Sequence, residues 1–327
     1  MKNSKIAVAL IGFGHLGRFH AQKVAQAGAE LVCIIEPNQN RKEIASVEFP
    51  QAKIFNSLEE VEAEGEGFDA AIIAAPTSQH FSLIKELFKN DKHIFCEKPI
   101  CSSQEEIAEL EEILATTNAN KKNLVLQVGH SERFHQAFEI LREISGGQAI
   151  TLSAGSSIVI NRLAPYKPRA LDVDVVQDLM IHDIDLLLYL FKEMPTKITV
   201  PTAHKFVSNY FDYVVADFEF ASGRHARLRA HRDYPKTLRE LEIINSSGSY
   251  LVDLFQNEIH YTEREKREGE VKKISYQKRD HLLLQQKHFY NSIINHANHT
   301  SKSIVPFEEG IAALKIAHMV LSSCRCL

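Results

Sequence analysis

The stretch IAVALIGFGHLG (residues 6–17) joins an apolar, strand-like run to a loop rich in glycine. Its glycines follow the spacing GxGxxG, in which the first permits a tight turn and the second lets the backbone approach a pyrophosphate. The third lets a following helix pack closely, with its N-terminus facing the anion. Such loops also arise without a ligand, but a strand before this one and a helical pattern after it favour a dinucleotide site. The loop residues expected to line the cofactor are Gly12, Phe13, Gly14, His15, Leu16 and Gly17.

The next strand-like run, ELVCIIE (residues 30–36), ends in a carboxylate. Glu36 stands near the position at which a dinucleotide-binding βαβ unit places an acid against the adenosine ribose. A carboxylate there accepts hydrogen bonds from the ribose hydroxyls and repels a 2′-phosphate. The sequence therefore favours NAD as the cofactor over NADP.

The first half of the chain alternates short apolar runs with amphipathic helical segments. The strand-like runs are residues 6–14, 30–36, 68–76, 93–99 and 124–130, and the helical ones are residues 16–27, 78–89 and 103–117. This alternation predicts βαβ units and a doubly wound parallel sheet. Runs of Val, Ile and Ala without polar interruption fit strands that are buried on both faces.

The pattern changes after Gly146 and Gly147, where longer alternating segments begin. Turn signals at ASGR (residues 221–224) and NSSGS (residues 245–249) predict hairpins in a large, open, mostly antiparallel sheet. Helices are expected near residues 281–296 and 308–322, and the prediction includes that these last helices pack back on the first domain. The predicted fold is α/β, with a dinucleotide-binding domain over residues 1–146 and an α+β domain over residues 147–327.

Composition narrows the class of protein. The 327 residues suggest two domains, and 44% hydrophobic with 24% charged residues are globular values. A net charge of −4 gives no electrostatic reason for nucleic acid or an anionic membrane as a partner, and the apolar run at the start is too short to span one. An odd number of cysteines, five, without CxxC argues against a disulfide framework and for a reducing, cytoplasmic location.

CEKP (residues 96–99) ends the fifth strand-like run, and ligands bind at the carboxyl ends of parallel strands. Near a cationic nicotinamide and away from water, Lys98 would have a lowered pKa and could exchange a proton with a hydroxyl. Pro99 fixes the turn, and a cis peptide bond there would aim the lysine. The alternative is a surface salt bridge between Glu97 and Lys98.

DLMIHDID (residues 178–185) lies in an otherwise apolar helical run. The spacing puts Asp178, His182 and Asp185 on one helix face. Burying these charged and polar groups costs roughly several kcal/mol unless hydrogen-bond or ion-pair partners compensate them. These three side chains could in principle bind zinc. An enzyme that transfers a hydride and has a lysine to supply positive charge does not need a metal, so no metal is predicted.

IGFGHLGRFH, AAPTSQH, CEKPI and DLMIHDID occur in this order, and together they resemble the Gfo/Idh/MocA oxidoreductase family over nearly the whole chain. The resemblance implies an N-terminal Rossmann domain and a C-terminal domain whose sheet makes the interface of a homodimer or homotetramer. It implies Lys98, Asp178 and His182 as the catalytic residues. It also implies further cofactor contacts at Ala75, Pro76, Thr77, His80, Glu97, Lys98 and Gln127.

GHSERFHQAF (residues 129–138) and NRLAPYKPRALDVDVV (residues 161–176) are similar to members that oxidise C3 of UDP-N-acetylglucosamine. That similarity implies a UDP-amino sugar as the substrate and contacts to it from Arg133, Phe134, Arg162, Tyr166 and Arg169. Arginine suits a diphosphate because it offers bidentate donors. The alternative is that the arginines pair with acids such as Asp172 and Asp174. Met180 and His135 depart from the residues that these members more often carry.

The resulting hypothesis is a hydride transfer from a sugar carbon to NAD. Lys98 or His182 removes the hydroxyl proton, and Asp178 orients the hydroxyl or the imidazole, while Asp185 supports the structure behind the site. Two alternatives stay open. The substrate is a free polyol or sugar, such as inositol or glucose, or the chain is a catalytically silent dinucleotide sensor.

Overall fold

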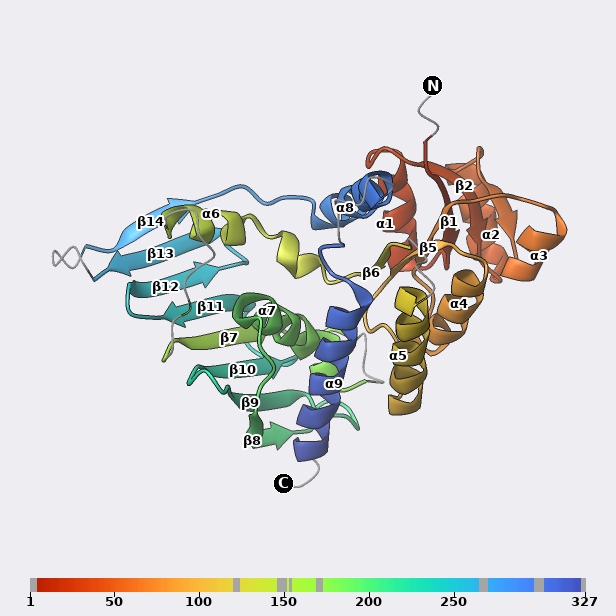
Figure 1. The fold of residues 1–327 in the computed structure, drawn as a ribbon. Helices are drawn as coiled ribbons and strands as arrows, with labels where there is room; N and C mark the ends of the chain where they lie inside the picture. Colours follow the sequence, from red (N-terminus) through yellow and green to blue (C-terminus); the bar gives the residue numbers. More distant parts are fainter. Residues whose placement is uncertain are drawn as a thin grey trace. The chain divides into compact units, whose positions relative to one another are not determined.

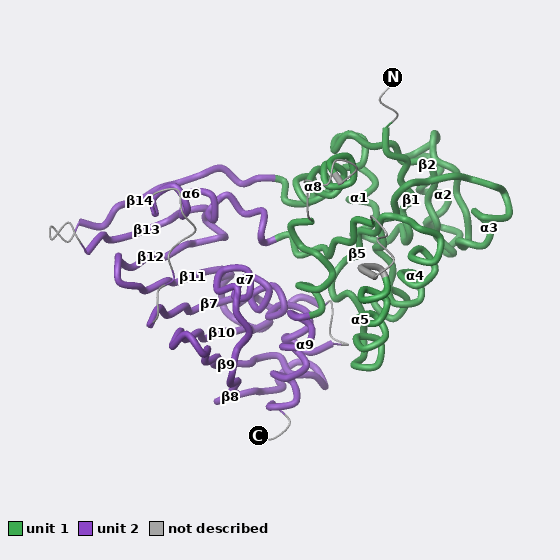
Figure 2. The backbone as a smooth tube through the Cα atoms, in the orientation of Figure 1, with its two compact units in different colours: residues 1–131, 280–311 green, residues 132–279, 312–327 purple. Residues whose placement is uncertain are grey.

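The protein was analysed as a computed structural model that describes residues 5–119, 124–145, 152, 155–168, 173–264, 270–296 and 303–324. The chain forms two compact units, drawn in different colours in Figure 2. Unit 1 comprises Met1–Ser131 and Asp280–Ile311, and unit 2 comprises Glu132–Arg279 and Ala312–Leu327. The first boundary between the units thus lies between Ser131 and Glu132, before the expected boundary at Gly146 and Gly147. The helix over residues 136–144 belongs to unit 2, and the two glycines lie outside the described residues.

Unit 1 contains a six-stranded parallel sheet with the order β3-β2-β1-β4-β5-β6. Its strands are β1 (Ala7–Ile11), β2 (Glu30–Ile35), β3 (Lys53–Phe55), β4 (Ala70–Ile73), β5 (His93–Cys96) and β6 (Leu126–Val128). The predicted doubly wound parallel sheet is confirmed. β1 pairs with β2 on one side and β4 on the other, so the strand order reverses there, which is where such sheets bind ligands.

Helices cover this sheet as its apolar strands require (Figure 1). They are α1 (His15–Val24), α2 (Gln39–Glu48), α3 (Leu58–Ala63), α4 (Thr77–Lys89), α5 (Gln104–Ala119) and α8 (His281–His296). Although α8 is distant in sequence, it lies beside α1 within unit 1, where Phe95 and Phe289 meet edge to face with ring centroids 5.8 Å apart. The core of unit 1 is therefore completed by a segment from the end of the chain.

Unit 2 contains an eight-stranded sheet with the order β14-β13-β12-β11-β7-β10-β9-β8. Its strands are β7 (Ser157–Leu163), β8 (Lys197–His204), β9 (Tyr213–Glu219), β10 (His225–His231), β11 (Leu238–Ile244), β12 (Gly248–Asp253), β13 (Glu258–Glu263) and β14 (Lys272–Ser275). β10 and β7 run parallel, and the other neighbouring strands run antiparallel. The predicted mostly antiparallel sheet is confirmed, as are the hairpins at residues 221–224 and 245–249.

The helices described in unit 2 include α6 (Gln136–Ile144) and α7 (Ile181–Phe191), and α9 (Phe307–Cys324) continues into it from unit 1. A π-helical turn, η2 (Val176–Met180), leads directly into α7, and a 3-10 turn, η1 (Ser131–Phe134), precedes α6. α7 lies against one face of the sheet (Figure 1), where Ile160 and Leu228 are fully buried. The other face is polar at its centre, where Arg227 and Asp217 pair side by side. This alternation along each strand explains which face of the sheet is covered.

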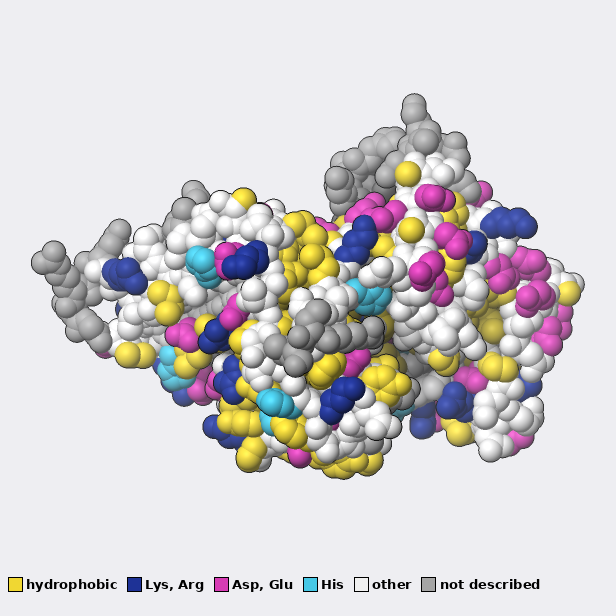
Figure 3. Space-filling view, turned by 90° about the horizontal axis from the view of Figure 1, so that it is seen from below, with side chains coloured by type: hydrophobic (Ala, Val, Ile, Leu, Met, Phe, Trp, Pro, Cys, Tyr) yellow, Lys and Arg dark blue, Asp and Glu magenta, His cyan; other side chains and the backbone are white. Residues whose placement is uncertain are grey.

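The surface shows no concentration of positive charge on the face drawn in Figure 3, where basic side chains are scattered among acidic and neutral ones. A surface that follows a nucleic-acid backbone would carry a basic stripe. None of the described helices is long and apolar enough to cross a membrane.

Candidate functional site

The glycine loop joins β1 to α1, and two of its glycines are required by close packing. Gly12 has a φ of +92°, and a Cβ built on it would lie 2.8 Å from the backbone of Ala74. A Cβ on Gly17 would collide with the carbonyl oxygen of Gly12. Gly14, by contrast, has room for a side chain, since the nearest atom to its virtual Cβ is the Arg41 Nη1 atom at an ordinary contact distance of 3.9 Å. The loop thus presents bare backbone at the start of α1, which is how such loops approach a phosphate.

A cavity of about 730 Å³ opens at this loop. It is lined by the ends of β1 and β2, by the loop after β4 (residues 74–76), by the starts of α2 and α3, and by one side of α4. The cavity therefore lies at the reversal in strand order, and its size suits part of a dinucleotide. Of the predicted cofactor residues, it brings together Gly12, Gly14, Glu36, Ala75 and Pro76.

Glu36 is held in place by main-chain donors. Its two carboxylate oxygens accept hydrogen bonds from the amides of Phe13 (2.8 Å) and Asn38 (2.9 Å), and the residue is only 3% exposed. The Arg41 Nη1 atom lies 3.6 Å from one of these oxygens. The carboxylate is thus fixed between the glycine loop and α2. Its contact with the adenosine ribose stays a prediction.

We predict that Gly12→Ala lowers dinucleotide affinity at least about tenfold and destabilises unit 1 by about 1–3 kcal/mol, since the methyl group strikes backbone and strains φ. Gly28→Ala is the matched control, because Gly28 has a φ of +96° with nothing within 4 Å of its virtual Cβ. It should share the backbone strain but retain affinity. Calorimetric titration with NAD and urea unfolding measure both quantities, and unchanged affinity in Gly12→Ala would contradict the prediction.

Glu97 directly follows β5 and is buried, at 7% exposure. Its Oε1 atom is 2.8 Å from the His20 Nε2 atom, and the Gln286 amide donates to the His20 Nδ1 atom (3.0 Å). Since Nδ1 accepts, Nε2 carries the proton and donates to the carboxylate. Tyr290 in turn donates to Gln286 (3.2 Å). This chain of buried hydrogen bonds connects α8 and α1 to the residue before Lys98.

His80 connects two loops of unit 1. Its ring nitrogens lie 2.8 Å from the Pro99 carbonyl oxygen and 2.9 Å from that of Ala75. It thereby bridges the loop after β4, which lines the cavity, and the loop after β5, which carries Lys98. The Lys98–Pro99 peptide bond is cis, in agreement with the sequence-based expectation.

Gln127 is fully buried at the centre of β6 and is engaged within unit 1. Its Nε2 atom donates to the Gln285 carbonyl oxygen (3.0 Å), and its Oε1 atom accepts from the Ser303 hydroxyl (3.0 Å). Its amide therefore holds the end of the chain against β6. The contact with a nicotinamide that the sequence resemblance implies stays a prediction.

The predicted catalytic residues are divided between the units. Lys98 belongs to unit 1, whereas Asp178 and His182 belong to unit 2, where η2 and α7 carry them. All three are partly exposed. The structure thus brings Asp178 and His182 together on one helical segment, as their spacing predicted.

The arginines expected to face the substrate are committed to ion pairs inside unit 2. Arg133 makes a bidentate pair with Asp185, at 2.8 and 2.5 Å, and both side chains are fully buried. Arg162 donates to Asp183 (2.8 Å) and lies 3.4 Å from Glu132. The alternative of pairing with acids therefore applies to both arginines, through Asp185, Asp183 and Glu132.

Charge around Arg162 is balanced by two carboxylates. Burial raises the pKa of Glu132, but the positive charges of Arg162 and Arg239 outweigh it and lower that pKa to about 2. Burial also raises the pKa of Asp183, although Arg162 opposes this. The sequence analysis assigned no role to Asp183, because it interpreted only Asp178, His182 and Asp185 of this helix. An acid in an apolar helix nevertheless indicates a cationic or hydrogen-bonding partner, since burying an uncompensated carboxylate is costly.

The remaining predicted substrate contacts differ in accessibility. Phe134 is buried in η1, Tyr166 is 45% exposed after β7, and Arg169 lies outside the described residues. Asp185 supports the structure through Arg133, as predicted. Direct contact of Arg133 or Arg162 with a substrate diphosphate stays a prediction. Among the described residues, no group of three or more His, Cys, Asp or Glu side chains is arranged to hold a metal ion.

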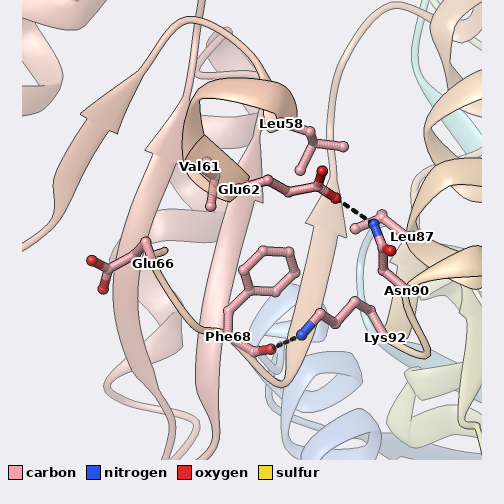
Figure 4. Close-up of a pocket in the computed structure, with 8 residues that line it drawn as sticks. All are labelled: Leu58, Val61, Glu62, Glu66, Phe68, Leu87, Asn90 and Lys92. Atoms are coloured by element: carbon pink, nitrogen blue, oxygen red, sulfur yellow. Dashed lines mark hydrogen bonds between the residues drawn. The ribbon is translucent and has the colours of Figure 1, made fainter. Parts of the chain in front are cut away.

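A second hollow, of about 280 Å³, lies beside α3 and the end of α4 (Figure 4). Its polar groups bond one another: Glu62 accepts from Asn90 (2.6 Å), and Lys92 donates to the Phe68 carbonyl (2.6 Å) while lying over that ring. Glu66 at its rim pairs with Lys53. The hollow therefore has its hydrogen bonds satisfied without a ligand.

Comparison with known proteins agrees with this geometry. Residues 6–130 match the profile described as "Oxidoreductase family, NAD-binding Rossmann fold", and residues 161–251 match the "GFO/IDH/MocA C-terminal domain". UDP-N-acetylglucosamine 3-dehydrogenase of Acidithiobacillus ferrooxidans is 33% identical over 88% of each chain, and its solved structure superposes with a TM-score of 0.84 over 98% of this chain and 97% of that one. scyllo-Inositol 2-dehydrogenase (NAD(+)) of Bacillus subtilis is 29% identical over 78% of this chain and 75% of its own.

Proposed function

Because the chain belongs to the Gfo/Idh/MocA oxidoreductase family, whose members here act on sugar and polyol CH–OH groups, we propose that it oxidises C3 of UDP-N-acetylglucosamine or a related UDP-amino sugar. The observation that carries the proposal is the identity to UDP-N-acetylglucosamine 3-dehydrogenase, which extends over 88% of both chains. The inositol dehydrogenase relative supports the alternative, a free polyol as substrate.

We propose NAD as the cofactor. The bare backbone of the glycine loop would hold the pyrophosphate at the N-terminus of α1, and Glu36 would accept hydrogen bonds from the adenosine ribose. Glu36 suits this role because its oxygens are already oriented by the amides of Phe13 and Asn38. When bound, the oxidised nicotinamide accepts the hydride from the alcohol carbon.

We propose Lys98, Asp178 and His182 as the residues that handle the proton. As the alcohol carbon loses its hydride, the hydroxyl proton must move to a base, and a lysine or a histidine can accept it near neutral pH once its environment tunes it. Lys98 is held by its neighbours, Glu97 in the buried hydrogen-bond chain and Pro99 through His80. Asp178 lies one helical turn before His182, and this spacing supports a role for Asp178 in orienting the imidazole or the sugar hydroxyl.

We propose a homodimer or homotetramer as the functional form and the cytoplasm as its location. The support for self-association is the sheet of unit 2, one face of which is covered by the described helices of that unit while its other face is not. Ile244 and Leu251, which are 38% and 42% exposed, add apolar area to the other, mainly polar face.

We predict that UDP-N-acetylglucosamine supports NADH formation, whereas N-acetylglucosamine and myo-inositol support little, because the diphosphate supplies binding energy that the free sugar lacks. A substrate deuterated at C3 should transfer deuterium to the cofactor and react more slowly. NADH absorbance and mass spectrometry of the cofactor measure these outcomes. Activity confined to inositol would contradict the substrate, and dinucleotide binding without any hydride exchange would favour the sensor alternative.

A further inference from the structure

The Glu97 carboxylate is fixed on three sides by groups of unit 1. Its Oε1 atom lies 2.8 Å from the His20 Nε2 atom, and its Oε2 atom accepts a hydrogen bond from the Lys98 amide (3.2 Å). On the third side it rests against bare backbone, because a Cβ built on Gly129 would lie 2.7 Å from the Oε2 atom. The carboxylate therefore joins the His20 imidazole to the main chain of Lys98.

His20 is itself held in one orientation and one tautomer. Its ring is fully buried and meets the Phe95 ring edge to face, with centroids 5.3 Å apart. The Gln286 amide nitrogen donates to the His20 Nδ1 atom (3.0 Å) and to the His20 carbonyl oxygen (3.1 Å). Because Nδ1 faces a donor, the ring proton is on Nε2, where it is directed at Glu97.

The orientation of the Gln286 amide is fixed in turn by its own helix. The Tyr290 hydroxyl, one turn further along α8, donates to the Gln286 Oε1 atom (3.2 Å), which leaves the amide nitrogen facing His20. Gln286 is fully buried, and Tyr290 is 2% exposed. A helix from the end of the chain thus determines which nitrogen of His20 carries the proton.

Burial makes the position of Glu97 depend on these donors. A buried carboxylate oxygen that loses its hydrogen bond is costly, so the side chain turns toward another donor or toward solvent. The Glu97 carboxylate bonds the Lys98 amide through its other oxygen, so such a turn also releases the main chain of Lys98. His20, Gln286 and Tyr290 supply neutral donors to this chain, and its charged neighbours are Glu97 and Lys98 themselves.

We propose that His20 is a positioning residue for hydride transfer. It holds the Glu97 carboxylate and, through it, the main chain of Lys98, while Gln286 fixes the tautomer that this requires. The inference rests on the role of Lys98 in the proposed function and extends that site to two buried residues of α1 and α8. A reacting group that is misplaced by about 1 Å can lower turnover by about 10²-fold, so the effect is measurable.

Two amide substitutions at position 20 test the proposal, because they place the donor differently. A glutamine carries its amide nitrogen as many bonds from Cα as the Nε2 atom of histidine, whereas an asparagine carries it as many bonds away as Nδ1. His20→Gln should therefore keep a donor for Glu97 and retain kcat within about threefold. His20→Asn and His20→Leu should lower kcat by about tenfold to a hundredfold, with a much smaller change in the affinity for NAD.

Two variants elsewhere separate positioning from stability. Gln286→Met keeps the length of the side chain but removes the donor, so the imidazole can adopt either tautomer and kcat should fall by about threefold to tenfold. Val24→Ala is the matched control, since Val24 is a fully buried core residue one turn after His20 on α1 and takes no part in the side-chain hydrogen bonds. It should lower the midpoint of urea unfolding but retain kcat.

Hydrogen exchange at the Lys98 amide is a readout that does not depend on the substrate. This amide donates to Glu97, so His20→Asn and His20→Leu should speed its exchange at least about tenfold more than that of the Ile94 amide, which bonds the Val125 carbonyl within the sheet. Val24→Ala should speed both amides alike. Nuclear magnetic resonance of the full chain, with and without NAD, measures both rates.

Several results would overturn the proposal. They are wild-type kcat in His20→Leu, equal kcat in His20→Gln and His20→Asn, and a loss in Val24→Ala as large as that in His20→Leu. If His20→Leu fails to fold, the contrast between the two amide variants and the result for Gln286→Met decide instead. If the wild type oxidises neither UDP-N-acetylglucosamine nor myo-inositol, the proposed function fails, and unchanged exchange of the Lys98 amide in His20→Asn then overturns the role of His20 separately.

Discussion

Replacing Lys98 with alanine is expected to lower kcat for the sugar substrate by about 10²–10⁴-fold, the contribution of a positioned acid–base group. Lys98 directly follows Glu97 at the end of β5, on the edge of the parallel sheet where ligands bind. Dinucleotide affinity should fall far less, because the glycine loop and Glu36 hold the other end of the cofactor. Steady-state kinetics and calorimetric titration of the same preparation separate the two effects.

The choice between Lys98 and His182 as the base follows from a comparison of variants. If Lys98 is the base, a small primary amine should restore part of the activity of Lys98→Ala, and His182→Asn should keep a pH-dependent kcat. If His182 is the base, imidazole should rescue a glycine variant at that position instead. Lys89→Ala, at the exposed end of α4, is the control and should match the wild type. Near-wild-type turnover in Lys98→Ala would exclude Lys98 from catalysis.

Replacing Arg133 with methionine is expected to destabilise unit 2 by about 3–5 kcal/mol, because it leaves the carboxylate of Asp185 buried without its partner. The pair is bidentate, both side chains are fully buried, and the guanidinium also lies 5.1 Å from the centre of the Tyr189 ring. Urea unfolding monitored by circular dichroism measures the change in the free energy of unfolding.

A second bidentate pair provides the matched control. Arg227 bonds Asp217 at 2.6 and 2.8 Å, but the arginine side chain is 54% exposed. Arg227→Met should therefore cost less than about 1 kcal/mol. The double variant Arg133→Met/Asp185→Leu should recover part of the lost stability, since neither charge then remains. Equal losses in the free energy of unfolding for the two arginine variants would show that burial does not determine how much the Arg133–Asp185 pair stabilises unit 2.

The fold was predictable where side-chain patterns are long and periodic. Apolar runs buried on both faces specified β1, β2, β4, β5 and β6, and turn residues specified the hairpins of unit 2. β3 and α2 were not predicted, because β3 has three residues and α2 buries only Ala45. The π-helical turn before α7 was also not predicted, since a shift in backbone hydrogen bonding leaves no mark on the apolar pattern.

The site was predictable in part for the same reason. Gly12, Gly14 and Glu36 are local signals, tied to one strand–loop–helix unit, and the structure brings them to one cavity. The hydrogen-bond chain from Glu97 through His20 to Gln286 was not predictable, because His20 and Gln286 come from helices far apart in the chain. Two side chains form a hydrogen bond only when they are close in space, and the number of residues between them in the sequence does not give that distance when they come from different elements.

By itself, the sequence determined the parallel sheet with its glycine loop, the acid at the end of β2, and the family to which the chain belongs. These follow from local backbone geometry and from periodic burial, which short stretches encode completely. Only the tertiary structure decided that Arg133 pairs with Asp185 and that Arg162 pairs with Asp183 and Glu132. It alone decided that Glu36 and Arg41 line the same cavity. The physical reason is that burial and charge compensation depend on which groups the folded chain places within a few ångströms of one another.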